Sequence, residues 1–326
     1  MIEDRLKEAA VALEAADSIA LACHLNPDPD ALGSMLGLSE VLRSRGKETV
    51  CSFGNEPFER PRWLAELPGS DALVPPAEFP KAPDMLVTCD AASLDRLGAL
   101  VGRVSKAREV IWIDHHRSND GLGTIPVIDP AASSTAEMVV RLVDAMGAEL
   151  TDDAAKCLYA GLVTDTGRFQ YEAVTPETIR LGARLRGYAF DHAKLCQALY
   201  EDNAYSYLKM LGGVLQRLHF VDDVGLVWTS LTREQLAEAG VDPSETDDLI
   251  DVIRTAREAD VAAVIKQQGD GRFKVSMRSR GTHDLAAVAA ARGGGGHRLA
   301  AGYTSQVGLD ETVTDLVGAL KGDAEA

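Results

Sequence analysis

The stretch Ser18-Ile-Ala-Leu-Ala-Cys23, followed by His24-Leu-Asn-Pro-Asp-Pro-Asp30, decides the fold of the first half of the chain. Its apolar run predicts a buried β-strand, and the pattern of 31–45 predicts a helix that ends at Gly46. Between them, one imidazole and two carboxylates occur within seven residues. The polar cluster therefore lies between a strand and a helix.

The same alternation of strand and helix continues through the first half. Further strands are predicted at 49–53, 85–89 and 110–113, and helices at 133–146 and 152–163. This order indicates an α/β fold with a mostly parallel sheet covered on both faces. Ligands of such sheets bind beyond the carboxyl ends of the strands, and His24, Asp90 and Asp114 each follow a predicted strand.

The second half has a different pattern. Segment 183–219 is predicted to be mainly helical, with candidate buried leucines at Leu195, Leu199, Leu208, Leu211, Leu215 and Leu218. Strands at 226–230, 261–267 and 273–277, with helices at 243–259 and 285–291, then predict a smaller α/β domain. We expect a first domain at 1–187, a helical connector at 188–218 and a second domain at 219–326.

Composition limits the class of protein. A chain of 326 residues is long enough for two domains, and 46% hydrophobic with 25% charged residues is typical of a soluble globular protein. No apolar run approaches the ~18 residues of a membrane span, and the acidic start MIEDRLKEAA does not resemble a secretory signal. Five cysteines without paired spacing do not predict a disulfide framework. We therefore expect a cytoplasmic protein.

The charge is unevenly distributed. A formal net charge of −17 argues against a long nucleic-acid track, which needs many phosphate contacts. From Lys266 to Arg298, however, seven Lys or Arg stand against two acids, a local net charge of +5. This basic segment suits a small anionic ligand; the alternative is an ordinary solvated strand face.

The two carboxylates at 28 and 30 are candidate metal ligands. In an extended loop, residues i and i+2 project to the same side, so Asp28 and Asp30 can face one cavity. Pro27 and Pro29 fix their own φ and bias Asn26 and Asp28 toward extended backbone, which stiffens the loop. Mixed oxygen and nitrogen donors suit ions such as manganese. The alternative role for both carboxylates is to form turns and cap the following helix.

Asp114-His115-His116 is the second cluster. Adjacent histidines after a strand are expected to point to opposite sides, so at most one binds a given metal while the other reaches the substrate. Asp114 can then fix a histidine tautomer. Ordinary loop histidines are the alternative. Asp90 and Asp165 are further candidates, for which a cap or an Asx-turn is the alternative.

The glycine-rich stretch Gly293-Gly294-Gly295-Gly296-His297-Arg298 follows Arg278-Ser279-Arg280 along the chain. Glycines permit close backbone approach and positive φ, and successive N–H groups can bind an anion. The neighbouring imidazole and guanidinium groups can add positive charge. The alternative is a flexible glycine loop.

In this order, these motifs resemble those of the DHH phosphoesterase family: HxNPDxD at 24–30, a central Asp90, DHH at 114–116 and TDTG at 164–167. The GGGGH segment at 293–297 is similar to that of the DHHA1 domain, so the resemblance covers nearly the whole chain. Length and domain content are most similar to the NrnA-like subgroup. Members of that subgroup degrade short oligoribonucleotides, and many dephosphorylate 3′-phosphoadenosine 5′-phosphate (pAp) or cleave cyclic or linear di-adenosine nucleotides.

The resemblance implies a centre of two Mn²⁺ ions, for which Mg²⁺ or Co²⁺ could substitute. Its metal ligands would be His24, Asp28, Asp30, Asp90, His115 and Asp165. His24 and Asp28 would bind one ion, and Asp30, His115 and Asp165 the other. Asp90 would bridge both. One position departs from the family, because Pro29 stands where a glycine is usual; we expect negative φ there and retained ligands.

The resemblance also implies the remaining roles. His116 would contact the scissile phosphate and Asp114 would support the histidines. The substrate would contact Arg117, Arg278, Ser279, Gly294, Gly295, Gly296 and His297. A hydroxide between two metal ions would attack phosphorus in line, and the second domain would close over the first and select short substrates.

The expected partners are therefore short RNA or small nucleotides, with no long nucleic acid and no membrane; a homodimer is compatible with the resemblance. A pyrophosphatase or polyphosphatase shares the DHH half, although the GGGGH segment argues against it. A single-strand exonuclease is disfavoured by the short acidic chain. A non-catalytic nucleotide-binding sensor is the alternative of a different class.

Overall fold

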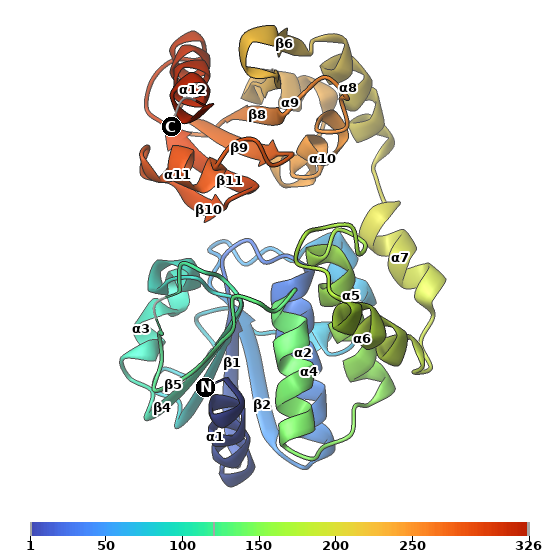
Figure 1. Cartoon of the computed structure of the whole chain (residues 1–326). Coiled ribbons are helices and arrows are strands. Elements are labelled where there is room, and N and C mark those ends of the chain that lie inside the picture. The colour runs from blue at the N-terminus through green and yellow to red at the C-terminus, as the bar shows by residue number, and fades with distance from the viewer. Residues whose placement is uncertain (1, 120, 325–326) are drawn as a thin grey trace. The chain divides into compact units, whose positions relative to one another are not determined.

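Two β-sheets, one in each half of the chain, organise the protein (Figure 1). The computed structural model describes residues 2–119 and 121–324. Contacts within the chain divide it into two compact units. Unit 1 ends at Asp202, and unit 2 begins at Asn203. In the described part of the chain, no helix has both the length and the apolar character needed to cross a membrane.

The sheet of unit 1 contains five parallel strands in the order β2-β1-β3-β4-β5. These are β1 Ser18–Cys23, β2 Glu48–Phe53, β3 Met85–Cys89, β4 Glu109–Asp114 and β5 Ile125–Ile128. In the register, Cys23 lies beside Cys89, and Cys89 lies beside Ile113. The residues that follow β1, β3 and β4 therefore emerge at the same edge of the sheet.

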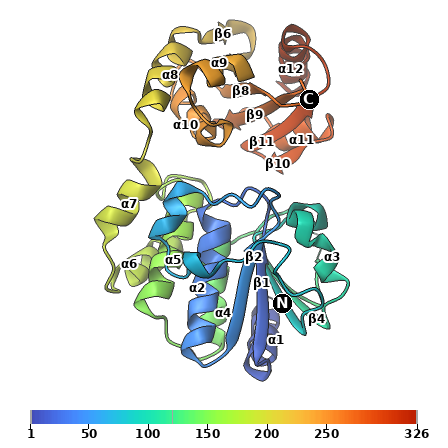
Figure 2. The same cartoon turned by 180° about the vertical axis from the view of Figure 1, so that it is seen from behind.

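Both faces of this sheet are covered. Alternate residues such as Leu21 and Ile111 pack in one hydrophobic cluster with helices α1, α2, α4 and α5, while Ala22 and Trp112 pack in another with residues of η3. The helices of the first face are α1 Ile2–Ala15, α2 Pro29–Ser44, α4 Thr135–Ala145 and α5 Asp152–Asp165 (Figures 1 and 2). The second face is covered by η3 Leu94–Leu100. Helix α3 Val101–Val104 directly follows η3 along the chain. Further elements of unit 1 are η1 Arg62–Glu66, η2 Ser70–Ala72 and α6 Pro176–Arg186.

Helices α2 and α5 pack at unusually short range, because glycines face the contact. A Cβ atom on Gly33 would lie 2.4 Å from the carbonyl oxygen of Cys157, and one on Gly161 would lie 2.7 Å from Oδ1 of Asp30. No side chain fits at either position. This close approach brings the ends of two helices that carry candidate ligands next to each other.

Replacing Gly33 by alanine is expected to destabilise unit 1 by about 1–3 kcal/mol, because a helix backbone must move to admit the methyl group. Chemical denaturation would measure the change in the free energy of unfolding. Gly102→Ala is the matched control, since a Cβ there meets nothing within 4 Å and its stability should stay within about 1 kcal/mol of the parent. Equal stability of Gly33→Ala and the parent would contradict the close packing.

Unit 2 has a mixed sheet in the order β10-β11-β9-β8-β7-β6, in which β7 and β8 are parallel and the other pairs antiparallel. The strands are β6 His219–Val221, β7 Leu226–Leu231, β8 Val261–Gln267, β9 Phe273–Ser279, β10 Gly295–His297 and β11 Ala300–Ser305. One face packs with α8 Tyr205–Gln216, α9 Arg233–Ala239 and α10 Leu249–Ile253. The other packs with α11 Leu285–Ala290 and α12 Leu309–Ala324.

The predicted fold class is confirmed: a mostly parallel α/β domain is followed by a smaller α/β domain. Within the expected connector 188–218, helix α7 (His192–Tyr200) belongs to the core of unit 1 and α8 to that of unit 2. The expected buried positions Leu208 and Leu215 are wrong, since they are 51% and 39% exposed. The inward face of α8 is formed instead by Tyr207, Met210 and Val214.

The continuous helix predicted at 243–259 is also wrong. The segment consists of η5 Pro243–Thr246 and the short helix α10. The hydroxyl of Thr246 donates back to the carbonyl of Pro243 at 2.7 Å, and Asp247 pairs with the buried Lys266. These side-chain contacts end the first turn. The pair between Asp247 and Lys266 joins residues 19 apart in the sequence, so helical periodicity could not predict it.

Candidate metal centre

His24 directly follows β1 and is almost completely buried. Its Nδ1 lies 2.7 Å from the carbonyl oxygen of Leu25. Because a carbonyl only accepts, Nδ1 carries the proton of this contact, and the lone pair of a neutral ring is then on Nε2. Nε2 lies 3.4 Å from Oδ2 of Asp90 and 3.7 Å from Oδ2 of Asp28. The ring is thus oriented as a ligand of a metal ion placed among these groups.

Asp28 combines the two roles that the sequence left open. Its backbone is extended (φ −88°, ψ 179°), and its Oδ1 accepts the N–H of Ala31 at 2.9 Å as the N-cap of α2. Its Oδ2 faces His24. Pro29 is the first residue of the helix, a position where its fixed φ is favourable. The proline therefore does not turn either carboxylate away.

The extended conformation expected for Asn26 is wrong, because its φ is +49°. Its N–H donates to Oδ1 of Asn55 at 2.9 Å, and Nδ2 of Asn55 donates to Oδ1 of Asn26 at 2.7 Å. Asparagine tolerates the left-handed region better than most residues do. This pair of hydrogen bonds outweighs the bias imposed by Pro27.

Asp30 is buried at the N-terminus of α4. Its Oδ2 accepts the N–H of Thr135 at 2.7 Å, and its Oδ1 accepts the N–H of Ala136 at 2.9 Å. The first turn of a helix favours a negative charge, so these bonds stabilise the carboxylate. Gly161 closes the other side without a side chain. Asp30 is consequently held in one place.

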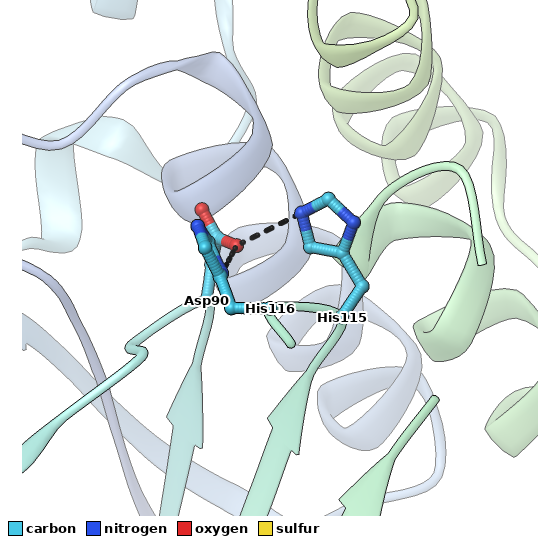
Figure 3. Close-up of side chains that lie close together, drawn as sticks. All are labelled: Asp90, His115 and His116. Carbon is cyan, nitrogen blue, oxygen red and sulfur yellow. Dashed lines mark ion pairs between the residues drawn. The ribbon is translucent and has the colours of Figure 1, made fainter. Parts of the chain in front are cut away.

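Asp90 contacts the imidazoles of both histidines of the second motif, as Figure 3 shows. It follows β3 with a φ of +59° and is buried. Its Oδ1 accepts the hydroxyl of Thr135 at 2.9 Å and lies 3.7 Å from Nε2 of His115 and 3.6 Å from Nδ1 of His116. Its Oδ2 faces His24. Its two oxygens therefore face two different sets of neighbours.

The turn after β4 depends on Asp114. Its Oδ1 accepts the N–H groups of His115 and His116 at 2.8 and 3.2 Å, and also Nδ1 of His116 at 2.7 Å. This turn brings both imidazoles to the same side, with ring centroids 4.9 Å apart. The expectation that the two histidines point to opposite sides is wrong, because the strand ends at Asp114 and the alternation ends with it.

Asn119 and Thr135 are parts of the site that the sequence analysis missed. Nδ2 of Asn119 donates to Oδ2 of Asp114 at 2.7 Å and to the carbonyl of Ala91 at 3.2 Å. Asn119 thereby fixes the carboxylate that orients His116. A signal existed, because an Asn shortly before a glycine turn often bonds nearby backbone, but its bond to Asp114 depends on the folded turn.

Asp165 is the last residue of α5, and its Oδ2 lies 3.3 Å from Nε2 of His115. Its side chain is 31% exposed. Gly167 follows with a φ of +57°, and the hydroxyl of Thr166 donates to the carbonyl of Leu162 at 2.7 Å. These features end the helix beside the cluster.

Three overlapping groups of ligand atoms result: Asp90, His115 and His116; His24, Asp28 and Asp90; and Asp30, His115 and Asp165. Within each group the atoms lie within 4.8 Å of one another. Two ligands bound at about 2.1 Å to one ion lie about 3.0–3.4 Å apart for octahedral or tetrahedral angles. The distances of 3.3–3.7 Å between imidazole and carboxylate atoms come close to this spacing, so the donors fit divalent ions.

The charges of the cluster compensate one another. Burial opposes the charged ring of His24, but Asp28 and Asp90 outweigh it and raise its pKa to about 10. Burial likewise opposes charging of His116, while Asp114 and Asp90 raise its pKa to about 9. Burial, and then the neighbouring carboxylate of Asp90, raise the pKa values of Asp30 and Asp165. The metal-free centre therefore holds protons where cations would bind.

Raising the pH is expected to tighten Mn²⁺ binding across the neutral range, because His24 must lose its proton before Nε2 can coordinate. Below a pKa of about 10, the affinity should rise about tenfold per pH unit for each proton displaced. Calorimetry at pH 7 in buffers with different ionisation enthalpies would count the released protons. His24→Gln should release one proton fewer. An affinity independent of pH would contradict this.

In unit 2 the predicted substrate contacts lie around the end of β9. Arg278 is half-buried, and its Nη1 donates to the carbonyl of Met277 at 3.1 Å. The hydroxyl of Ser279 accepts the N–H of Gly281 at 3.0 Å. Part of the local positive charge is paired, since Arg272 pairs with Asp270, Arg292 with Asp315 and Lys266 with Asp247. In unit 1, Arg117 is exposed.

The glycine stretch includes a strand. Gly295–His297 form β10, which pairs with β11 at the edge of the sheet, and Gly294 to His297 are exposed. A Cβ on Gly294 would lie 2.2 Å from the oxygen of Gly302, and one on Gly296 would lie 2.5 Å from that of Ala300. Two of the glycines are therefore required by close strand packing, and Gly295 faces open space.

The sequence of the chain is similar to those of known proteins. The chain is 36% identical over 308 residues to the bifunctional oligoribonuclease and PAP phosphatase NrnA of Thermus thermophilus, covering 94% of this chain and 90% of that protein. Residues 18–162 match the model of the DHH family, N-terminal domain, and residues 225–323 match that of the DHHA1 domain. The chain belongs to the DHH family. It is accordingly an enzyme, a hydrolase of phosphoric ester bonds.

Two further relatives support this DHH-family membership. The probable bifunctional oligoribonuclease and PAP phosphatase NrnA of Streptococcus mutans is 32% identical over 295 residues, which cover 90% of this chain and 91% of that protein. The crystal structure of an exopolyphosphatase-related protein from Bacteroides fragilis superposes with a TM-score of 0.89 at 25% identity, covering 99% and 97% of the two chains. The similarity to these two proteins therefore covers 90% or more of the chain.

Proposed function

We propose that this DHH-family enzyme hydrolyses short oligoribonucleotides and pAp with the aid of two Mn²⁺ ions. The observation that carries the proposal is the cluster of overlapping ligand groups, in which Asp90 and His115 each belong to two groups. A shared carboxylate between two neighbouring groups is the arrangement expected of a two-metal site. Imidazole and carboxylate donors suit manganese, and Mg²⁺ or Co²⁺ could replace it.

The proposed ligand sets use two of the groups, and Asp90 is assigned to both ions because it lies in the group of His24 and Asp28 and also contacts His115. His24 and Asp28 would hold one ion, Asp30, His115 and Asp165 would hold the other, and Asp90 would bind both. When bound, the ions would supply a water of lowered pKa and positive charge next to the phosphoryl oxygens. Every other element of the proposed chemistry comes from side chains of the chain itself.

His116 is proposed to stabilise the phosphoryl group. Its Nδ1 donates to Asp114, so its orientation is fixed, and its raised pKa favours the imidazolium form in the metal-free protein. Nε2–H of such a ring can donate to an oxygen on which negative charge develops during hydrolysis. Asp114 supports His116 and remains bound to Asn119.

Substrate binding is proposed for Arg117 in unit 1 and, in unit 2, for Arg278, Ser279, Gly294, Gly295, Gly296 and His297. Arg278→Ala is expected to raise KM about 10-fold or more with a smaller effect on kcat, because a guanidinium–phosphate contact contributes mainly to binding. Steady-state kinetics on a diadenylate would separate the two constants. An unchanged KM would contradict this role. Arg272→Ala is the control, because that side chain already pairs with Asp270 on the surface.

A panel of substrates tests the proposed function. With Mn²⁺, the purified chain should release mononucleotide from diadenylate and phosphate from pAp, and chelation of the metal should stop both reactions. Cyclic di-AMP and its linear product belong in the same panel. A long single-stranded RNA should be cleaved much more slowly, since a net charge of −17 opposes extended phosphate contacts.

Other outcomes would identify other functions. Faster hydrolysis of pyrophosphate or polyphosphate than of diadenylate would indicate a pyrophosphatase or polyphosphatase. Processive degradation of long strands would indicate a single-strand exonuclease, and tight nucleotide binding without Mn²⁺-stimulated cleavage would indicate a sensor. We also propose a cytoplasmic location, which the five free cysteines, four of them buried, support.

A further inference from the structure

Arg96 reaches the candidate metal centre but has none of the roles described so far. It lies in η3, and its carbonyl accepts the N–H of Leu25, the residue after His24, at 2.7 Å. Gly98, in the same segment, has a φ of +52°, and a Cβ there would lie 2.3 Å from Leu25. The backbone around Arg96 is therefore fixed against the loop that carries His24.

The guanidinium of Arg96 and the carbonyl of Leu25 both contact the same ring nitrogen of His24, which can form a hydrogen bond with only one of them. Its Nη2 lies 3.0 Å from Nδ1 of His24, while the same Nδ1 lies 2.7 Å from the carbonyl of Leu25. A guanidinium only donates and a carbonyl only accepts, so one ring nitrogen cannot serve both. The orientation that makes Nε2 a ligand gives the Nδ1 proton to Leu25. The N–H of Arg96 then faces the N–H of His24 and finds no acceptor on this ring.

Arg96 also has no carboxylate partner among residues 2–119 and 121–324, and its side chain is exposed. A fixed cation beside a centre that binds further cations is unfavourable unless an anion lies between them. The planar fork of arginine matches the oxygens of a phosphate group, with which it forms short charge-assisted hydrogen bonds.

We propose that Arg96 binds a phosphate oxygen of the substrate at the His24 side of the centre. This inference rests on the proposed function, because it takes the substrate to be a phosphate ester. Arg96 is thus a substrate-binding residue supplied by unit 1, and it distinguishes phosphorylated ligands from the corresponding nucleosides.

Calorimetric titration of the Mn²⁺-loaded full chain with AMP tests the proposal, with adenosine as the probe that lacks phosphate. Arg96→Gln should weaken AMP binding about 10- to 100-fold, as expected for loss of a charged hydrogen bond, and should leave adenosine binding unchanged. Arg96→Lys, which keeps the charge but not the fork, should lose less. Arg108→Gln is the control, because this 78% exposed arginine precedes β4 at the opposite edge of the sheet.

Manganese affinity, measured without nucleotide by electron paramagnetic resonance, separates this role from a structural one. It should be unchanged or tighter in Arg96→Gln, because a cation has been removed. Weaker Mn²⁺ binding with unchanged AMP binding would overturn the proposal and make Arg96 a support of His24. If Arg96→Gln does not fold, the same comparison is made with Arg96→Lys.

The proposed function fails separately. A parent protein that binds neither Mn²⁺ nor AMP, and does not cleave diadenylate, would remove both proposals. A parent that cleaves diadenylate, together with an Arg96→Gln variant of parental AMP affinity, would remove only the role of Arg96.

Discussion

Asp90→Ala is expected to lower kcat on diadenylate by about 10³-fold or more. Removing one pre-positioned polar group from an active site costs about 10²–10³-fold, and Asp90 belongs to two ligand groups. The variant should also bind fewer Mn²⁺ ions per chain, which metal analysis after gel filtration would show. Turnover equal to that of the parent would reject the bridging role.

Asp129→Ala is the matched control for Asp90→Ala. Asp129 also directly follows a strand of the same sheet, β5, but its carboxylate pairs with Arg141 at 2.7 Å. We expect kcat within about threefold of the parent, because Asp129 belongs to none of the three ligand groups. The comparison separates loss of a ligand from loss of any acidic residue at this edge.

Asp114→Asn is expected to lower kcat by about 10²–10⁴-fold, because an amide at this position disturbs the orientation and tautomer of His116. Oδ1 of Asp114 accepts three N–H groups and Oδ2 accepts one from Asn119, so either orientation of the new amide places N–H against N–H. The buried mismatch should also cost about 1–3 kcal/mol of stability. Stopped-time kinetics and urea denaturation measure the two effects.

A second substitution distinguishes the hydrogen-bond pattern from a general loss of structure. In Asp114→Asn combined with Asn119→Asp, the amide at 114 can donate to the carboxylate at 119 and its oxygen can face His116, while the bond from residue 119 to the carbonyl of Ala91 is lost. We expect this double variant to recover stability and part of the activity relative to Asp114→Asn alone. No recovery of either would show that the 114–119 contact does not determine the orientation of His116.

The strands of unit 1 could be predicted from the sequence because each is a short apolar run that ends at a polar residue. β1 and β3 begin and end where the apolar runs do, and the following residues, His24 and Asp90, meet in space. This proximity could be predicted because the carboxyl ends of parallel strands all lie at the same edge of the sheet. The prediction that His24 and Asp90 lie close together did not depend on their spacing in the sequence or on the composition of the chain.

Contacts that depend on three-dimensional turns could not be predicted. The side on which His115 and His116 lie is decided by the carboxylate of Asp114, which binds both backbone N–H groups, and not by strand alternation. Likewise, Asn55 decides the backbone of Asn26 from a different loop. In α8 the repeating leucines suggested the buried face, but Leu208 and Leu215 are exposed. Leu211 is partly buried, and Tyr207, Met210 and Val214 fill the core beside it.

The helix N–H groups that bind Asp30 have a consequence for how the enzyme takes up and loses metal ions. Two N–H groups already compensate this carboxylate before any cation arrives. Loss of an ion therefore does not leave Asp30 as an isolated charge in the interior, and the surrounding framework should survive extraction. We expect stripped protein to keep its native far-ultraviolet circular dichroism and to regain full turnover when the ion is returned. Such an enzyme can exchange its ions with the available supply without refolding.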